Sequence, residues 1–512
     1  MAVSAEAIGT SYRGGRVKNT TATLTAVGLA SVMVPLAVTG PAVALTSMGT
    51  DLSGSGQSVQ WVLHAYNVTF AASLLAAGGL ADRLGRRRAL VIGALIYASM
   101  SLVCALSTQI LLVDIARAIQ GIGSAGILTS GAAILAATFA GPARARAFGV
   151  LGTAFGAGLA LGPVVAGVLV DLANWRAVFL VNLAFAVVVV ALSPRLLESR
   201  SQGAPIDWPG LATFSGALFL LTLGFVSGQT AGWSNVRTIA SFIGSGLFIA
   251  AFAVVERRSA APVFDLSLLR RPTFLAVMSQ PFTIVFGFVI LVVYLPSYVQ
   301  GVDGYSPSAA GLLLLPLMAP VFVLPILIGQ VAGRVPARFI LTISSLLIAA
   351  GSFWLVTLEP GQDWWRVAAP LVVFGLGVGS AFGVMDNAAV SSVPVQDAGM
   401  AAGMFNTMRI TGESIATAGA AALLAGVTLA HLRASAPGVS DDHARAIAIQ
   451  STQGRIDAAL AGVPADQYAS ALAAARDGLT AGMHATVLAV AVLAFVGAVI
   501  TFLSIRDSEV GQ

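Results

Sequence analysis

Long apolar runs alternate with short polar stretches along almost the whole chain. Each run is about 18–25 residues long, which is the length that an α-helix needs to cross the hydrocarbon core of a bilayer. The runs are continuously apolar and lack the alternation of lipid-facing strands, so we predict helices and not a barrel. The predicted spans lie near residues 20–45, 60–80, 89–107, 109–130, 147–170, 176–193, 209–228, 237–255, 273–299, 308–330, 338–357, 367–391, 399–428 and 483–504.

The composition supports an all-α polytopic membrane protein. Hydrophobic residues make up 57% of the chain and charged residues only 10%, and the mean hydropathy is +0.89. Soluble domains carry about a quarter charged residues. The net charge of +5 does not indicate a nucleic-acid partner, because the arginines lie in short clusters between apolar runs.

The basic residues predict the orientation. Most of the 27 lie in alternate loops and in the two terminal segments, and such loops stay on the cytoplasmic side. Both termini are therefore expected in the cytoplasm, and the protein in the cell membrane. Residues 1–19 carry Arg13, Arg16 and Lys18 ahead of an apolar run that is too long for a cleaved signal peptide, so we interpret that run as the first span.

One charged cluster stands out between two apolar runs. "GGLADRLGRRRAL", residues 78–90, contains one aspartate and four arginines, so it must lie in water at a membrane surface. Its first ten residues align weakly with "GQVAGRVPAR", 329–338: Gly78 falls on Gly329, and Gly333 stands where the first copy has Asp82. This repeat predicts a transporter of two six-helix halves around a midplane cavity.

The expected organisation follows from the spans and the repeat. It comprises a cytoplasmic N-terminus (1–19), an N-terminal six-helix bundle (20–193), two inserted helices with flanking loops (194–272), a C-terminal six-helix bundle (273–504) with a long external loop (429–482), and a cytoplasmic C-terminus (505–512).

Several motifs together resemble a known family. "GGLADRLGRRRAL" resembles the loop signature of the major facilitator superfamily, "ARAIQGIG" (116–123) its helix-4 motif, and "GLALGPVVAG" (158–167) its helix-5 antiporter motif. "WRAVFLVN" (175–182) and "YVQGVDGYSPSAAGLLLLP" (298–316) are similar to the fourteen-helix drug:proton antiporter branch.

The resemblance implies two six-helix bundles plus two extra helices, alternating access, and proton-driven export of amphipathic compounds such as drugs or antibiotics. It implies no cofactor and a monomer surrounded by lipid. Arginine supplies nearly all of the basic residues, and alanine and glycine are abundant, which is typical of a high-GC bacterium. Multidrug efflux or self-resistance to a natural product fits such a source.

The family gives the loop signature the role of a conformational latch at the cytoplasmic end. Asp82 is placed to accept hydrogen bonds from arginines or from a helix N-terminus. The remaining latch residues are Gly78, Arg83, Gly85, Arg86 and Arg87. Arginines that only set the topology are the alternative, which explains the basic residues but not Asp82.

Glycines thin one face of helix 5. The antiporter motif comprises Gly149, Gly158, Gly162, Pro163 and Gly167. We expect these residues to permit close packing between the two bundles and a bend in the helix. The resemblance implies a role in sealing or switching, and passive packing is the alternative.

Ionisable side chains within the spans are the sharpest candidates for coupling, since a charge there costs at least about 2.5–3.5 kcal/mol unless it is paired or hydrated. Helical spacing predicts pairs between Arg117 and Asp114 and between Arg409 and Glu413. Either pair could be purely structural. Glu413 is the leading proton-coupling candidate, followed by Asp386 and then by the Asp114/Arg117 pair.

Other polar residues are expected to line the cavity, and one expected acid is missing. The cavity candidates are His64, Tyr66, Asn67, Gln120 and Arg409, although His64 is more easily explained as hydrogen-bonded structure. Related exporters usually carry an aspartate in the middle of helix 1, where the alignment here places Ala37. Either another acid carries the proton, or transport is not coupled in the usual way.

Other functions remain as alternatives or find no support. A lipid or metabolite transporter or facilitator on the same fold is the first alternative, and a non-transporting membrane sensor is the second. The four histidines and the single cysteine show no metal-ligand spacing, and no nucleophile set or nucleotide-binding loop is present, so neither an enzyme nor a metal site is expected.

Overall fold

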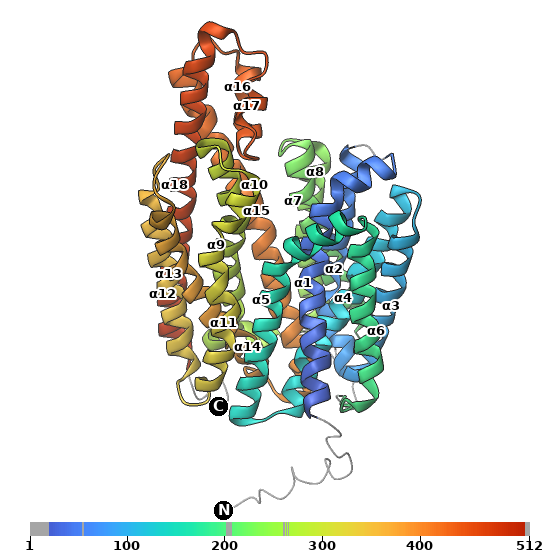
Figure 1. Ribbon diagram of the computed structural model, residues 1–512. Coiled ribbons are helices and arrows are strands. Elements are labelled where there is room, and N and C mark those ends of the chain that lie inside the picture. The colour runs from blue at the N-terminus through green and yellow to red at the C-terminus, as the bar shows by residue number, and fades with distance from the viewer. Residues whose placement is uncertain are drawn as a thin grey trace, which may run out of the picture.

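The computed structural model describes residues 20–53, 56–200, 207–259, 262, 264 and 266–506, and these form helices without strands. Two helical bundles stand side by side, and one carries a long hairpin at its top (Figure 1). We call the end where α1 begins and α18 ends the lower end. The predicted tails, 1–19 and nearly all of 505–512, lie outside the described residues.

The N-terminal half contains six long helices. They are α1 (Thr20–Asp51), α2 (Gly56–Leu84), α3 (Arg86–Leu106), α4 (Ile110–Thr138), α5 (Gly141–Leu172) and α6 (Arg176–Leu192), followed by the short turn η1 (Ser193–Arg195). The loop between α2 and α3 is reduced to Gly85, whose φ of 112° lies in a region that glycine adopts without strain.

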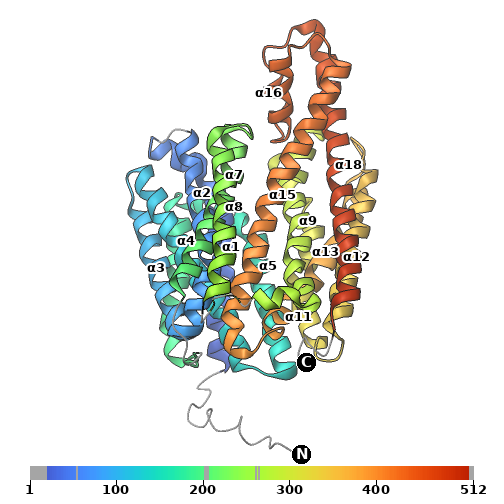
Figure 2. The same ribbon diagram turned by 180° about the vertical axis from the view of Figure 1, so that it is seen from behind.

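Two further helices separate the halves in sequence. They are α7 (Trp208–Ala231) and α8 (Val236–Arg258). α7 and α8 pack against each other, and α7 also contacts α2 of the N-terminal half and α15 of the other half (Figure 2). The predicted insertion of two helices is therefore present, and it lies beside one seam between the halves.

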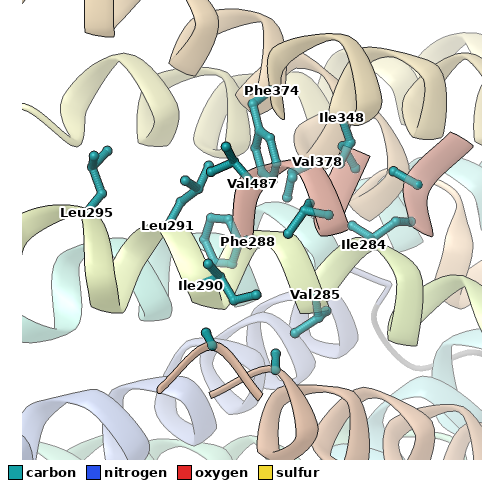
Figure 3. Close-up of a cluster of buried hydrophobic side chains, with 14 of the residues drawn as sticks. Ile284, Val285, Phe288, Ile290, Leu291, Leu295, Ile348, Phe374, Val378 and Val487 are labelled. Atoms are coloured by element: carbon teal, nitrogen blue, oxygen red, sulfur yellow. The ribbon is translucent and has the colours of Figure 1, made fainter. Parts of the chain in front are cut away.

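The C-terminal half contains the remaining elements. They are η2 (Leu266–Arg270), α9 (Pro272–Asp303), α10 (Pro307–Leu312), α11 (Leu315–Val331), α12 (Ala337–Trp354), η3 (Leu355–Thr357), α13 (Trp364–Phe382), α14 (Met385–Ser391), η4 (Val395–Asp397), α15 (Ala398–Ser435), α16 (Asp441–Ser451), α17 (Ile456–Ala459) and α18 (Ala465–Ser504). Its core joins α9, α12, α13 and α18, where Phe288 of α9 lies near Phe374 of α13 (Figure 3).

The helices account for most of the predicted spans. Twelve of the described helices are long and apolar enough to cross a membrane, and a thirteenth is present if the bent pair Gly141–Leu159 and Leu161–Leu172 is one span. α2 falls short of that hydropathy because polar residues such as His64 and Asn67 lie within it. The predicted total of fourteen spans therefore stays a prediction.

The predicted external loop 429–482 has a different form from the one expected. α15 continues through its first part to Ser435 and α18 begins at Ala465, so two long helices extend beyond the bundle (Figure 1). A methyl group on Gly478 would lie 2.8 Å from Cα of Thr428, which shows how closely the two helices approach. Alanine favours the helical continuation, and glycine allows the two helices to pack at short distance.

The two halves meet at two helix crossings near the lower end. α2 packs against α15, and α5 packs against α11. A methyl group on Gly403 of α15 would lie 2.7 Å from the carbonyl oxygen of Leu74, and one on Gly149 of α5 would lie 2.6 Å from that of Pro325. Backbone therefore meets backbone at both crossings, which only small residues permit.

The helix-5 glycines fall into two groups, which corrects the expectation that all of them pack between the bundles. Gly149 faces α11 of the opposite half, but Gly158 and Gly162 face α1 of their own half. A methyl group on Gly158 would lie 3.2 Å from Cβ of Pro35, and Gly162 is packed against Thr39. Gly167 has more room, with its nearest neighbour 4.0 Å away.

The predicted bend in α5 is present. The helix turns by 45° between Leu159 and Leu161, and Pro163 lies just beyond that point. Proline explains the bend, since its ring clashes with the carbonyl group of residue 159 and it provides no N–H for a hydrogen bond. The bend separates the part of α5 that contacts α11 from the part that contacts α1.

This division predicts a loss of stability for the second group. Gly158→Leu is expected to lower the free energy of unfolding by about 1–3 kcal/mol, since a leucine would overpack the contact between α1 and α5. Thermal unfolding of the detergent-purified variant measures the effect. Gly246→Leu in α8 is the matched control because no atom lies within 4 Å of a methyl group placed there. Equal melting temperatures for both variants would contradict the assignment.

Candidate functional site

Asp82 joins the two halves at the lower end. Its carboxylate is only 5% exposed. Oδ1 accepts hydrogen bonds from Nε and Nη2 of Arg86 at 2.9 and 2.8 Å, and Oδ2 accepts one from the backbone N–H of Met400 at 2.9 Å. Met400 lies in the first turn of α15, where N–H groups are free and the helix dipole favours an anion. The aspartate therefore satisfies a helix end in the opposite half.

Arg86 extends the same network. Its guanidinium donates to the carbonyl oxygen of Ala133 in α4 at 3.4 Å and to that of Val395 in η4. Val395 belongs to the C-terminal half, so the arginine also bridges the two halves. A buried ion pair with additional hydrogen bonds is favourable only when most donors and acceptors are satisfied, which is the case here.

The other latch residues surround this pair. Gly78 lies against the carbonyl oxygen of Gly399, and any side chain there would separate α2 from α15. Arg87 donates its backbone N–H to Oε1 of Glu198 at 3.1 Å and pairs with that carboxylate at 3.5 Å. Arg83 is half-buried beside them. Glu198 was missed by the sequence analysis because only the fold brings the end of α6 to this loop.

Arg117 has different partners from the one predicted. It is 1% exposed and donates to the carbonyl oxygens of Val62 and Ala37 at 2.8 and 2.9 Å and to Oε1 of Gln120 at 2.6 Å. No ion pair among the described residues joins it to Asp114, whose Oδ1 is buried without a hydrogen bond. The spacing of three residues predicted a pair with Asp114, but the guanidinium of Arg117 points into the bundle, where it meets backbone carbonyl groups.

Two of the predicted cavity residues are fully buried beside Arg117 in this structure, and their place in a cavity stays a prediction. The guanidinium lies 4.1 Å from the ring centroid of Tyr66, and both Tyr66 and Gln120 are 0% exposed. Tyr66 donates its hydroxyl to Ser124 at 2.8 Å, and Gln120 donates to Ser101 at 2.7 Å. These side chains form a buried polar core inside the N-terminal half of this structure.

Two further residues that were predicted to line the cavity, His64 and Asn67, lie on α2. His64 and Asn67 are half-buried. The His64 ring meets Trp61 edge-on at 6.0 Å, and its Nε2 is buried without a hydrogen bond. Both residues thus remain accessible in part, unlike the neighbouring Tyr66.

Arg409 pairs with Asp386 and not with Glu413. Its Nη2 lies 2.9 Å from Oδ2 of Asp386, and its Nη1 donates to Oδ1 of Asn406 at 3.0 Å. Asp386 stands in the first turn of α14, just after a break that separates α13 from α14. The i, i+4 spacing predicted that Arg409 pairs with Glu413. The break between α13 and α14 instead brings Asp386 to the arginine.

Aromatic rings enclose the buried arginine. Its guanidinium carbon lies 4.5 Å from the ring centroid of Phe155 and 5.2 Å from that of Phe405. Phe155 belongs to α5 of the opposite half and meets Phe382 edge-on at 6.1 Å. Arg409 is therefore a buried bridge between the halves in this structure.

Glu413 lies one helical turn above Arg409, towards the middle of the span. Its side chain is half-buried, and within the described residues it forms no ion pair and no side-chain hydrogen bond. Tyr294 of α9 donates to the carbonyl oxygen of Thr417 one turn further along, at 2.8 Å, and Phe282 packs against Gly412. A carboxyl group without a charge partner at this depth favours its neutral form.

The described residues contain no group of three or more histidine, cysteine or acidic side chains that could hold a metal ion. Cys104 is buried as a free thiol. The charged groups instead act between helices, so the arrangement is suited to hold or release contacts between two halves.

Sequence comparison gives the family of the chain. Residues 25–417 match the model of the Major Facilitator Superfamily. The chain is 30% identical over 411 residues to the multidrug resistance protein Stp of Mycobacterium tuberculosis, covering 79% of this chain and 75% of Stp. It is 30% identical over 406 residues to the tetracenomycin C resistance and export protein of Streptomyces glaucescens, covering 79% and 76%. It is 33% identical over 392 residues to the probable actinorhodin transporter of Streptomyces coelicolor, covering 73% and 67%.

Solved structures share the fold. The proton:xylose symporter XylE aligns with a TM-score of 0.55 at 14% identity, covering 87% of this chain and 96% of XylE. The human organic anion transporter MFSD10 aligns with a TM-score of 0.53 at 16% identity, covering 94% and 99%. The helical architecture and the sequence match agree, and the chain is a multi-pass membrane transporter that belongs to the Major Facilitator Superfamily.

Proposed function

We propose that the chain is a secondary active exporter of amphipathic small molecules that works by alternating access and is coupled to protons. The lower end faces the cytoplasm, as the basic loops indicate. The main support is the Asp82 network, in which one half holds a helix end of the other at the lower end. Relatives named for multidrug resistance and antibiotic export support the direction and the substrate class.

The proposed cycle depends on breaking these contacts. While Asp82 holds the N-terminus of α15, the lower end is closed and substrate leaves on the other side. Opening the lower end separates α2 from α15 and α5 from α11, which exposes Asp82 and Arg86 to water. Hydration then replaces the hydrogen bonds, so the two states differ by a modest free energy.

Glu413 is the proposed proton-coupling group. It has no charged partner near the middle of the span, whereas Asp386 is held by Arg409. An ionised carboxylate there costs at least about 2.5 kcal/mol, and the cost disappears on protonation or when water reaches the group. A proton is therefore exchanged at Glu413 when the transporter changes the side of the membrane to which it is open.

A lipid or metabolite facilitator remains the second candidate, and one observation favours it. Ala37 stands where related exporters carry an acid, and its carbonyl oxygen accepts from Arg117 at 2.9 Å. The arginine thus has a backbone partner at the place where the resemblance implies a carboxylate. Uncoupled transport would follow if no other acid had taken over the role.

The first prediction concerns the latch. Asp82→Asn is expected to reduce export about tenfold or more, because hydrogen bonds to a charged group contribute about 1.5–3 kcal/mol. Accumulation of a panel of amphipathic antibiotics in cells that express each variant measures export. Arg88→Gln is the control, since that arginine is exposed and lies 3.8 Å from its nearest acid. Wild-type export by correctly inserted Asp82→Asn would remove the latch from the mechanism.

The second prediction concerns the opposite crossing. Gly149→Leu is expected to hold the lower end open, because the added side chain cannot fit against Gly329 and Pro325. Accessibility of single cysteines at the lower end to a membrane-impermeant maleimide measures opening, and labelling should rise. Unchanged labelling together with unchanged export would show that the crossing tolerates bulk.

The third prediction tests coupling in liposomes. Glu413→Gln is expected to lose substrate flux driven by a pH gradient while keeping substrate exchange, since the neutral amide cannot carry a proton. Asp386→Asn and Asp114→Asn are compared in the same assay, and Glu359→Gln serves as an exposed control. A normal response to the gradient in all three of the variants Glu413→Gln, Asp386→Asn and Asp114→Asn would disprove the assignment. A wild type that ignores the gradient would favour the facilitator.

A further inference from the structure

The two crossings at the lower end, of α2 with α15 (the first seam) and of α5 with α11 (the second seam), are related by the internal repeat. A methyl group on Gly78 of α2 would contact the carbonyl oxygen of residue 399 and lie 3.4 Å from Cα of residue 403 in α15. A methyl group on Gly329 of α11 would lie 3.0 Å from the carbonyl oxygen of residue 145 and 2.9 Å from Cα of residue 149 in α5. The same contact, with the same spacing of four residues, therefore occurs on both sides of the molecule.

The charges on the two seams are not equivalent. On the first seam, Asp82 reaches the first turn of α15 four residues after Gly78. On the second seam, the position four residues after Gly329 is Gly333. A methyl group on Gly333 would lie 3.1 Å from Cβ of Pro142, which stands in the first turn of α5. The repeat thus brings a helix start to both seams, but the carboxylate to only one.

Cavities occupy the place of the missing carboxylate. One of about 480 Å³ is lined by Pro142 and Arg146 of the N-terminal half and by Gln330, Gly333 and Arg334 of the C-terminal half. An adjacent cavity of about 280 Å³ shares Pro142 and Gly333 and adds, among others, Arg144 and Asn387. None of the residues lining either cavity is acidic.

Arg146 and Arg334 line the same cavity from opposite halves. Arg146 comes from α5 and Arg334 from the turn after α11, both are exposed, and neither forms an ion pair within the part of the chain that the structure describes. Two like charges brought together by closure of the lower end oppose that closure. An anion between them would reverse the sign of the interaction.

We infer that this seam binds the phosphate group of an anionic phospholipid, which bridges Arg146 and Arg334 and stabilises the state with a closed lower end. The cavity lies where α5 begins and α11 ends, at the lower end of the molecule. The proposed orientation places this end at the cytoplasmic membrane surface, where lipid headgroups supply phosphates. Arginine pairs favourably with phosphate through two parallel hydrogen bonds. The lipid supplies on this seam the negative charge that Asp82 supplies on the other.

The inference rests on the proposed alternating access but not on the substrate or the coupling ion. The test therefore uses neither substrate nor pH gradient. Spin labels are placed at positions 195 and 271, which are exposed at the lower end of the two halves, and Cys104 is left in place because it is buried. Pulsed electron resonance then gives the ratio of closed to open molecules in nanodiscs of phosphatidylcholine alone, of phosphatidylcholine with phosphatidylglycerol, and of phosphatidylcholine with inorganic phosphate in the buffer.

Phosphatidylglycerol is expected to raise the ratio of closed to open molecules by roughly fivefold or more, since one arginine near an anionic surface contributes about 1 kcal/mol. Arg146→Gln and Arg334→Gln should each lose most of this response, while the exposed control Arg258→Gln keeps it. Gly333→Asp should raise the closed fraction in phosphatidylcholine alone, because it places a carboxylate where the repeat has Asp82, and Gly333→Asn should not.

Three results would overturn the inference. The first is a wild-type ratio that does not change with phosphatidylglycerol. The second is an unchanged response in both arginine variants, which would place the lipid effect elsewhere. The third is an equal response to inorganic phosphate, which would make a soluble anion and not a lipid the ligand. An inactive exporter that still responds to phosphatidylglycerol would contradict the proposed function alone.

Discussion

Charge within the membrane is the constraint on which the rest of the structure depends. A buried ion is tolerated only where it is paired, bound to backbone groups or reached by water. Three groups of buried charges among the described residues meet that requirement in different ways. Asp82 and Arg86 use each other and a helix end, Arg117 uses backbone carbonyls, and Arg409 uses Asp386 and aromatic rings. Glu413 and Asp114 have no such partner among the described residues, and Glu413 is the one that we propose as the site of proton exchange.

The same requirement bears on the two states that alternating access would give the lower end. Contacts between the halves combine backbone packing at glycine with buried ionic hydrogen bonds, and neither type adapts gradually to a small displacement. Close glycine contacts are lost as soon as the helices separate, and the ionic groups are then hydrated. The contacts at each seam are therefore expected to be either formed or lost, without intermediate positions. Because the charge differs between the two seams, we propose that the chain itself closes one of them and that a lipid closes the other.

Helix α15 connects the contacts at the lower end to the hairpin that it forms with α18 at the other end of the molecule. α15 begins at the Asp82 contact, carries Arg409 and Glu413, and continues to Ser435 beyond the bundle. Because a continuous helix transmits displacement along its axis, movement at its first turn reaches the proposed coupling residue and the hairpin together. The break between α13 and α14 has the opposite effect, since it allows Asp386 to turn towards Arg409 independently of the rest of α13.

The sequence by itself determined the membrane class, the helical fold and the family. Hydrophobic length and motif spacing can be read locally, and a bilayer admits few structures other than helices for long apolar segments. It also identified Asp82 and the glycines as unusual. Only the tertiary structure decided their partners. Helical spacing offered Glu413 to Arg409 and Asp114 to Arg117, yet a guanidinium on a long side chain reaches whatever the neighbouring helices present, here Asp386 and the carbonyl oxygens of Val62 and Ala37. Likewise, the assignment of Gly149 to the seam and of Gly158 to α1 depends on which way each face of a bent helix points, and that direction is set by packing between distant segments rather than by local sequence.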